Sequence, residues 1–115
     1  MPHIIVEYAK QRVNDTQVDA MLHTIHHSIV ESSLYKPVMI KTRAYPFTKF
    51  TNAGGSEPYI HIQARIKATK DLDKKKRLSD VIIKGLSTLN IPASVSTVEV
   101  IDMERESYGK YSPNG

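Results

Sequence analysis

Residues 59–68 read YIHIQARIKA, and every second side chain in this stretch is apolar. Successive side chains of a strand point to opposite faces of its sheet. The alternation therefore predicts a strand that buries one face and leaves the other face more polar. The predicted buried face carries Ile60, Ile62, Ala64 and Ile66.

The pattern around this strand repeats within the chain at a constant offset of 56 residues. Residues 3–8 (HIIVEY) are rich in β-branched and aromatic types, which predicts an equivalent strand in the first half. Each match is weak alone, but together the matches indicate two copies of one unit. They are Ile4 with Ile60, Val6 with Ile62, Leu22 with Leu78, Ile25 with Val81, and Val30 with Leu86.

Each half also contains a predicted helix, over residues 16–33 and 72–89, because apolar side chains recur there at helical spacing. Asp15 or Thr16 is a suitable N-cap for the first helix. Gly85 lies within the second stripe, where we expect it to allow close approach to the sheet. The predicted stripes are Val18, Met21, Leu22, Ile25 and Ile29, then Leu78, Val81, Ile82, Leu86 and Leu89.

Two further strands are predicted at residues 38–50 (VMIKTRAYPFTKF) and 95–103 (VSTVEVIDM). Pro46 cannot donate a hydrogen bond to a neighbouring strand, so we expect pairing to be interrupted there or the strand to lie at an edge. Residues 51–57 (TNAGGSE) form a loop, because paired glycines favour turns.

The element order predicts an α/β (α+β) fold in which two consecutive β-α-β units form a four-stranded sheet with both helices on one face. We expect one domain over residues 1–115, since this length is typical of a single domain. The other sheet face would have no cover within one chain. We therefore expect that face to be buried against other subunits.

The composition excludes several classes of protein. The chain has no cysteine, and therefore no disulfide or thiolate metal site. No apolar run approaches the ~20 residues of a membrane span, and the first residues lack a signal peptide's features, so we expect a cytoplasmic protein. The net charge is +4, but the basic run at residues 74–77 lacks interleaved aromatic residues. We interpret that run as a solvated helix face and expect no nucleic-acid partner.

Four stretches (MPHIIVEY, IKTRAY, YIHIQARIKA and VEVIDM) resemble, in order and spacing, the 5-carboxymethyl-2-hydroxymuconate isomerase family of the tautomerase superfamily. The N-terminal Pro-His-hydrophobic-Val-Glu segment is the most specific part. The resemblance implies a homotrimer of β-α-β repeats that needs no cofactor. It also implies that the protein moves a proton between carbon and oxygen of an unsaturated keto acid in aromatic-acid catabolism. The implied base is Pro2, and cationic side chains hold the substrate carboxylates.

Pro2 can act as a base only after Met1 is removed, because a peptide-bond nitrogen has no basicity. A free α-amino group has a pKa of about 7.7–8.0, which burial and nearby cations would lower toward neutrality. The simpler interpretation is that Met-Pro is a common start. The predicted strand directly after Pro2 favours a function, since it would hold the amine in place. If Met1 is retained, we expect it to point toward the substrate space near Lys41 and Arg43.

Lys41 and Arg43 are two residues apart on a predicted strand and so project from the same face. The family pattern is Ile-Arg-x-Arg; Arg43 matches it, and Lys41 keeps the charge without the bidentate fork of arginine. Lys70 lies where the family has a functional arginine before the second helix. The resemblance implies that these three cations bind substrate. The alternative is that they are ordinary solvated side chains.

The remaining titratable residues indicate no second site. His23, His26 and His27 have helical spacing that could suggest metal ligation, but no carboxylate accompanies them, so we expect no metal. His3 and His61 are expected to orient strands or line the margin of the site. The strand carboxylates are expected to form salt bridges: Glu7, Glu99 and Asp102.

The sequence therefore predicts a tautomerase that moves a proton within an unsaturated 2-keto or 2-hydroxy acid resembling 5-carboxymethyl-2-hydroxymuconate. Pro2 would be the general base, with Lys41, Arg43 and Lys70 as carboxylate ligands. The alternative is a non-catalytic trimeric module of the same fold that binds anions. A free Pro2 amine facing a basic pocket would favour the enzyme over the binding module.

Overall fold

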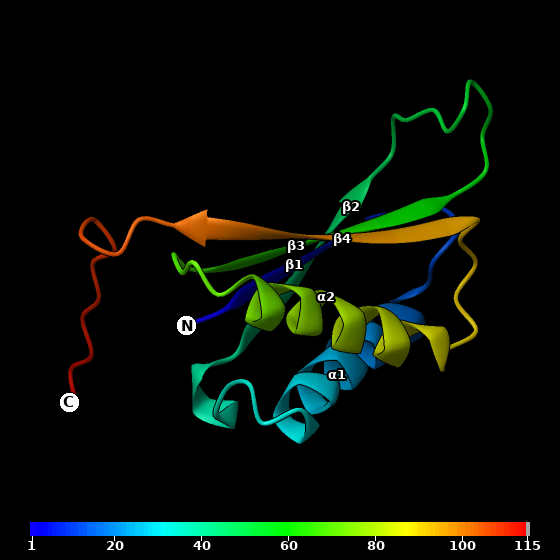
Figure 1. Cartoon of the computed structure of the whole chain (residues 1–115). Coiled ribbons are helices and arrows are strands. Elements are labelled where there is room, and N and C mark those ends of the chain that lie inside the picture. Colours follow the sequence, from blue (N-terminus) through cyan, green and yellow to red (C-terminus); the bar gives the residue numbers. More distant parts are fainter. Residues whose placement is uncertain (115) are drawn as a thin grey trace.

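The computed structural model describes residues 1–114 and contains one four-stranded sheet and two α-helices (Figure 1). The elements follow the predicted order of two β-α-β units, which confirms that prediction. They are β1 (His3–Ala9), α1 (Asp15–Glu31), a 3₁₀ turn (Pro37–Met39), β2 (Lys41–Phe47), β3 (Tyr59–Lys67), α2 (Leu72–Ser87) and β4 (Val95–Met103).

The sheet has the strand order β2-β1-β3-β4. The two strands of each unit are parallel, and the units meet through the antiparallel pair of β1 and β3. Both helices cover one face of the sheet, as predicted (Figure 1). Pro46 lies in β2, which is an edge strand, so its missing donor interrupts no central ladder.

The core lies between this sheet face and the two helices. The buried positions of β3 alternate as predicted, and Ile62 of β3 is fully buried together with Ile4 and Val6 of β1. The helices contribute Met21 and Ile82, which are also fully buried. Burying each such side chain contributes about 1.5–3 kcal/mol, so the repeated apolar pattern accounts for the arrangement of the layers.

Three local expectations are wrong in detail. β2 begins at Lys41 rather than at residue 38, because Pro37 starts the 3₁₀ turn that precedes the strand. The N-cap of α1 is Asn14, whose side chain accepts a hydrogen bond from the backbone of Gln17 at 2.8 Å. The Gln17 side chain accepts a hydrogen bond from the Asn14 backbone in return, which forms a capping box.

Gly85 faces the other helix rather than the sheet, which corrects the third expectation. A Cβ atom at this position would lie 2.3 Å from Ser28 Oγ and 3.2 Å from Ser28 Cβ. The missing side chain therefore lets α2 approach α1 closely.

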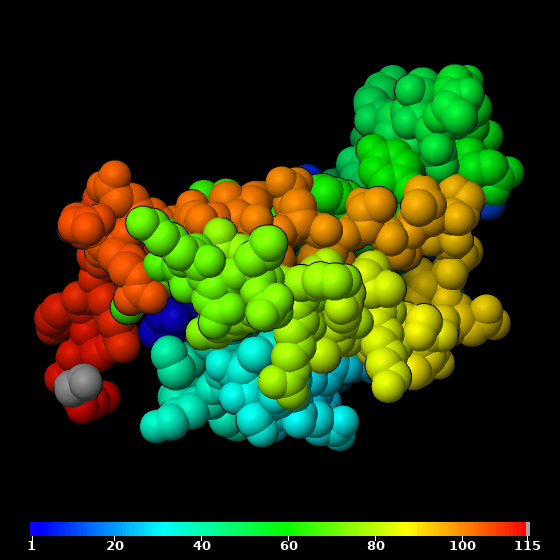
Figure 2. Space-filling model, viewed as in Figure 1, coloured from blue at the N-terminus to red at the C-terminus, as the bar shows by residue number. Residues whose placement is uncertain are grey.

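The loop between β2 and β3 projects beyond the end of the sheet (Figures 1 and 2). An aromatic cluster anchors its base, with the rings of Phe47 and Tyr59 stacked at 4.9 Å and that of Phe50 edge-on to both. At the opposite end of the sheet, the N-terminus lies near the segment that follows β4. Within residues 1–114, no helix has the length and apolar character needed to cross a membrane.

Candidate active site at the N-terminus

Met1 lines a cavity of about 250 Å³ at the end of the sheet where β3 and β4 finish and α2 begins. Figure 2 shows the blue N-terminal atoms in a recess between the C-terminal tail, the start of α2 and the segment before β2. Three of the lining side chains are cationic. The lining residues are Met1, Tyr35, Met39, Lys67, Thr69, Lys74 and Arg105.

The cavity is strongly electropositive. Burial, followed by the charge of Lys67 and of further cations, lowers the pKa of the Met1 amine below its ordinary value of 8.0. Lys74 is held with its Nζ 4.6 Å from the centre of the Tyr35 ring, a cation–π arrangement. An amine placed here is therefore more available as a free base at neutral pH than one in water.

Pro2 is fully buried and held at the start of β1. Its carbonyl oxygen accepts a hydrogen bond from the backbone of Lys41 at 3.0 Å, which extends the pairing of β1 with β2 by one residue. The Pro2 nitrogen is part of the peptide bond with Met1. The strand thus fixes the position of Pro2, while Met1, the residue before it, lines the cavity.

A second group of cations surrounds His3 on the sheet face that the helices leave bare. Lys41 and Arg65 are the register partners of His3 on the two neighbouring strands, and Arg43 follows Lys41 on the same face. Burial lowers the pKa of His3, and the charges of Arg43, the N-terminus, Lys41 and Arg65 lower it further. We call Lys41, Arg43 and Arg65 the face group, and the three cavity cations the cavity group.

The expectation that Met1 points toward the space near Lys41 and Arg43 is wrong. Lys41 and Arg43 are exposed on β2, and neither lines the cavity that holds Met1. Lys41 Nζ donates a hydrogen bond to the Val38 carbonyl at 3.3 Å, and the Arg43 guanidinium lies 5.8 Å from the Tyr45 ring centre. The two predicted cations therefore lie near His3 on the sheet face rather than in the lining of the cavity.

Lys70 is exposed in the connection between β3 and α2 and does not line the cavity. Lys74, one turn into α2, lines it instead. The interpretation of residues 74–77 as one solvated face is wrong for Lys74 and Lys75, which are partly buried, whereas Lys76 and Arg77 are exposed. Lys75 Nζ lies 2.7 Å from Asp102 Oδ2, and Arg77 donates a hydrogen bond to the Ser32 carbonyl at 2.7 Å.

The segment after β4 forms another wall of the site. Arg105 lines the cavity and donates a hydrogen bond from Nε to the Ala68 carbonyl at 2.7 Å. The Tyr108 hydroxyl lies 2.7 Å from Nε2 of His3, the residue directly after Pro2. The segment after β4 therefore meets the N-terminal segment at the candidate site.

A family model described as 5-carboxymethyl-2-hydroxymuconate isomerase matches residues 2–100. The chain belongs to this family. The match begins at Pro2 and ends within β4, so Arg105 and Tyr108 lie beyond the matched region.

Solved structures with the same fold include "Pt0534 Inactivated by 2-Oxo-3-pentynoate", with a TM-score of 0.81 and 14% identity, covering 94% of this chain and 91% of that chain. A fused 4-OT symmetric trimer has a TM-score of 0.79 and 14% identity, covering 98% of this chain and 93% of that chain. A 5-carboxymethyl-2-hydroxymuconate isomerase from Deinococcus radiodurans R1 has a TM-score of 0.71 and 13% identity, covering 96% of this chain and 88% of that chain. At such identities the likeness shows the fold alone. Among curated proteins, no sequence matches significantly.

Some other titratable side chains of this isomerase-family chain form hydrogen-bonded pairs outside the lining of the cavity. His61 lies between Thr97 Oγ1, at 2.7 Å, and Glu99, at 2.5 Å. Glu7 accepts a hydrogen bond from Gln63 at 3.4 Å. Within residues 1–114, no group of three or more His, Asp or Glu side chains is arranged to hold a metal ion.

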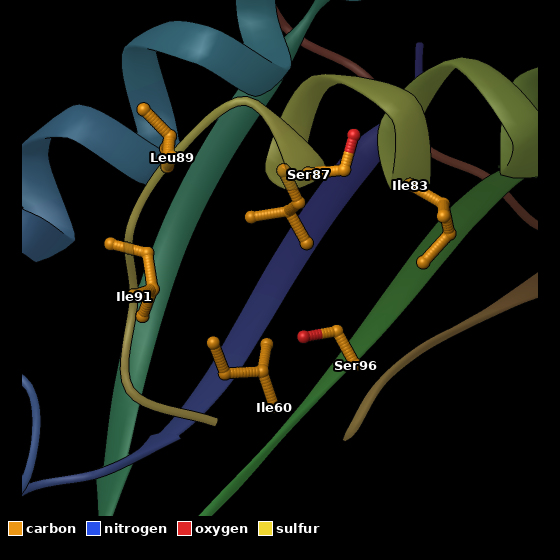
Figure 3. A pocket seen from close by; sticks show the side chains of 7 residues that line it. Ile60, Ile83, Ser87, Leu89, Ile91 and Ser96 are labelled. Atoms are coloured by element: carbon orange, nitrogen blue, oxygen red, sulfur yellow. The ribbon is translucent and has the colours of Figure 1, made fainter. Parts of the chain in front are cut away.

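An apolar groove of about 210 Å³ lies between the C-terminal end of α2 and the first residues of β3 and β4 (Figure 3). Neither an acid nor a base lines it, so it cannot perform proton transfer. Its lining residues are Ile60, Ile83, Leu86, Ser87, Leu89, Ile91 and Ser96.

Proposed function

We propose that the protein is a cofactor-independent tautomerase whose general base is the secondary amine of Pro2 after loss of Met1. The observation that carries this proposal is the buried position of Pro2, held by β1 and flanked by the cavity group and the face group. A fixed, partly desolvated amine beside several cations has the lowered pKa that a general base needs near neutral pH.

In the proposed reaction, the Pro2 amine removes a proton from the enol hydroxyl or the α-carbon of an unsaturated 2-hydroxy or 2-keto acid. The electron pair left behind spreads over the conjugated system as a dienolate. The prolinium then returns the proton to a distant carbon, so that no atom is gained or lost. Oriented cations stabilise the developing negative charge in a site with little water.

A spectrophotometric assay tests this function. Unsaturated 2-hydroxy and 2-keto acids absorb differently in their conjugated and unconjugated forms, so their interconversion can be followed directly. We expect protein that begins at Pro2 to accelerate the interconversion of at least one such acid, including those resembling 5-carboxymethyl-2-hydroxymuconate. Binding of these acids without any acceleration would instead support the non-catalytic anion-binding module.

The activity should depend on pH as expected of a base with a lowered pKa. Burial and then the charge of Lys67 are the largest effects that lower the pKa of the Met1 amine, and we expect both to act on the Pro2 amine once Met1 is removed. We expect kcat/KM to rise with pH through a pKa below the ~7.7–8.0 of a free amine. Lys67→Gln should move this limb to higher pH, so that activity falls more at about pH 6 than at about pH 8. An unchanged pH profile in Lys67→Gln would show that the charge of Lys67 does not lower the pKa of the base.

We also propose that the protein is a homotrimer. The sheet face opposite the helices carries apolar side chains, including Val95, which is 48% exposed, and β2 and β4 leave their outer edges unpaired. The fused 4-OT structure of the same fold is a symmetric trimer. Light scattering at micromolar concentration should give three times the mass of one chain. A stable monomer would contradict this assembly.

A further inference from the structure

The segment after β4 is tied to the N-terminal site by three separate contacts. Tyr108 bonds through its hydroxyl to His3, and its ring lies 5.6 Å from the ammonium group of Lys67. Arg105 is anchored through Nε to the carbonyl of Ala68. Figure 1 shows this segment, in orange and red, at the same end of the sheet as the N-terminus. A segment fixed in this way can present a side chain to the substrate.

Arg105 is suited to hold a carboxylate. Its hydrogen bond to Ala68 uses only Nε, and within residues 1–114 no ion pair involves its guanidinium group. The anchored Nε orients the planar group, and the side chain lines the cavity that contains Met1. A guanidinium can bind a carboxylate bidentately through two parallel hydrogen bonds, which the point charge of a lysine cannot.

The two cation groups lie on different sides of the N-terminus. The cavity group includes Arg105, and the face group includes Arg43. One carboxylate can engage only one of these groups at a time. A ligand with a carboxylate at each end can engage both, with its carbon chain passing the N-terminal residue.

We propose that Arg105 is a specificity-determining residue that binds the second carboxylate of a dicarboxylate substrate, and that Tyr108 is a positioning residue that holds the segment of Arg105 in place through His3. This inference rests on the proposed function for its placement of substrate beside Pro2. It assigns roles to residues beyond the region that the isomerase family model matches.

Binding of unreactive dicarboxylates tests the role of Arg105. Glutarate, adipate and pimelate are each compared with the monocarboxylate of equal length by NMR titration of protein that begins at Pro2. We expect the best dicarboxylate to bind more tightly than its monocarboxylate. Arg105→Gln should weaken dicarboxylate binding by about tenfold to a hundredfold, the effect of one charge-assisted hydrogen-bonded contact, and leave monocarboxylate binding within about twofold. Arg12→Gln, which removes another exposed arginine, is the matched control and should change neither.

Tyr108→Phe tests the positioning role, because it removes only the hydroxyl that reaches His3. We expect KM for an unsaturated dicarboxylate to rise about threefold to tenfold while kcat is retained, since one neutral hydrogen bond is lost. Tyr111→Phe is the control in the same segment, where Tyr111 is 86% exposed. Equal effects of the two variants would overturn the positioning role.

The binding and kinetic results separate this inference from the proposed function. If the parent protein isomerises substrate and Arg105→Gln retains its preference for dicarboxylates, the inference is wrong and the isomerase stands. If the parent binds dicarboxylates through Arg105 but isomerises none of the acids, the isomerase is wrong and the role of Arg105 in binding stands.

Discussion

Protein that begins at Pro2 is expected to isomerise its substrate at least about a hundredfold faster than protein that retains Met1, the lower end of what general bases contribute. With Met1 attached, the Pro2 nitrogen is an amide and accepts no proton. Met1 itself also forms part of the wall of the cavity beside the cavity group. The two forms can be prepared by complete and incomplete removal of Met1, verified by mass spectrometry and compared in the same assay.

Two physical effects contribute to this difference, and ligand binding distinguishes them. If Met1 only obstructs access of substrate to Pro2, the Met1 form should bind adipate more weakly and regain activity at high substrate concentration. If the missing base dominates, kcat should remain low at saturation. Equal melting temperatures would show that both forms are folded. Equal rates of the two forms would contradict the proline mechanism.

Arg43→Ala is expected to lower kcat/KM about tenfold to a hundredfold, the loss that follows removal of one charge-assisted hydrogen bond to a carboxylate. The melting temperature should change little, because in the single chain Arg43 is exposed and its guanidinium lies over the ring of Tyr45 rather than in the core. Arg12→Ala is a suitable control, since it removes an exposed arginine from the other end of β1.

His3 provides an independent readout of the same substitution. The charge of Arg43 is, after burial, the largest influence that lowers the pKa of His3. Arg43→Ala should therefore raise the pKa of His3, which NMR titration of the imidazole measures. A parallel loss of activity and melting temperature with no change at His3 would indicate a structural role for Arg43.

The fold could be predicted from the sequence because its signals are local and repeated. The composition of β1, the alternation in β3, the two helical stripes and the offset of 56 residues all indicate the same pair of units. The errors lie where one residue changes the local geometry. Pro37 turns the chain before β2, Asn14 rather than its neighbours caps α1, and Gly85 meets Ser28 of the other helix. Which element a glycine faces depends on helix packing, which the apolar pattern alone does not specify.

The candidate site could be predicted only in part. The strand pattern placed Lys41 and Arg43 on one face of β2, and it placed Pro2 directly before β1. The cavity group comes instead from the end of β3, the first turn of α2 and the segment after β4: Lys67, Lys74 and Arg105. No spacing in the sequence links these three segments, because they meet only through the parallel pairing of β3 with β4 and the return of α2. The tail after residue 103 carries no periodic pattern, so nothing in the sequence indicated its contact with His3.

The most direct test of the central claim is to map the covalent product that 2-oxo-3-pentynoate forms with protein beginning at Pro2. This reagent inactivates Pt0534, a protein of the same fold. Addition of the amine nitrogen across its triple bond forms one carbon–nitrogen bond, moves the amine proton to carbon and releases nothing. Peptide mapping by mass spectrometry should therefore find the full mass of the reagent on Pro2. The fraction of activity lost should equal the fraction of protein that is labelled. Loss of activity with the label on a lysine and Pro2 unmodified would contradict the account.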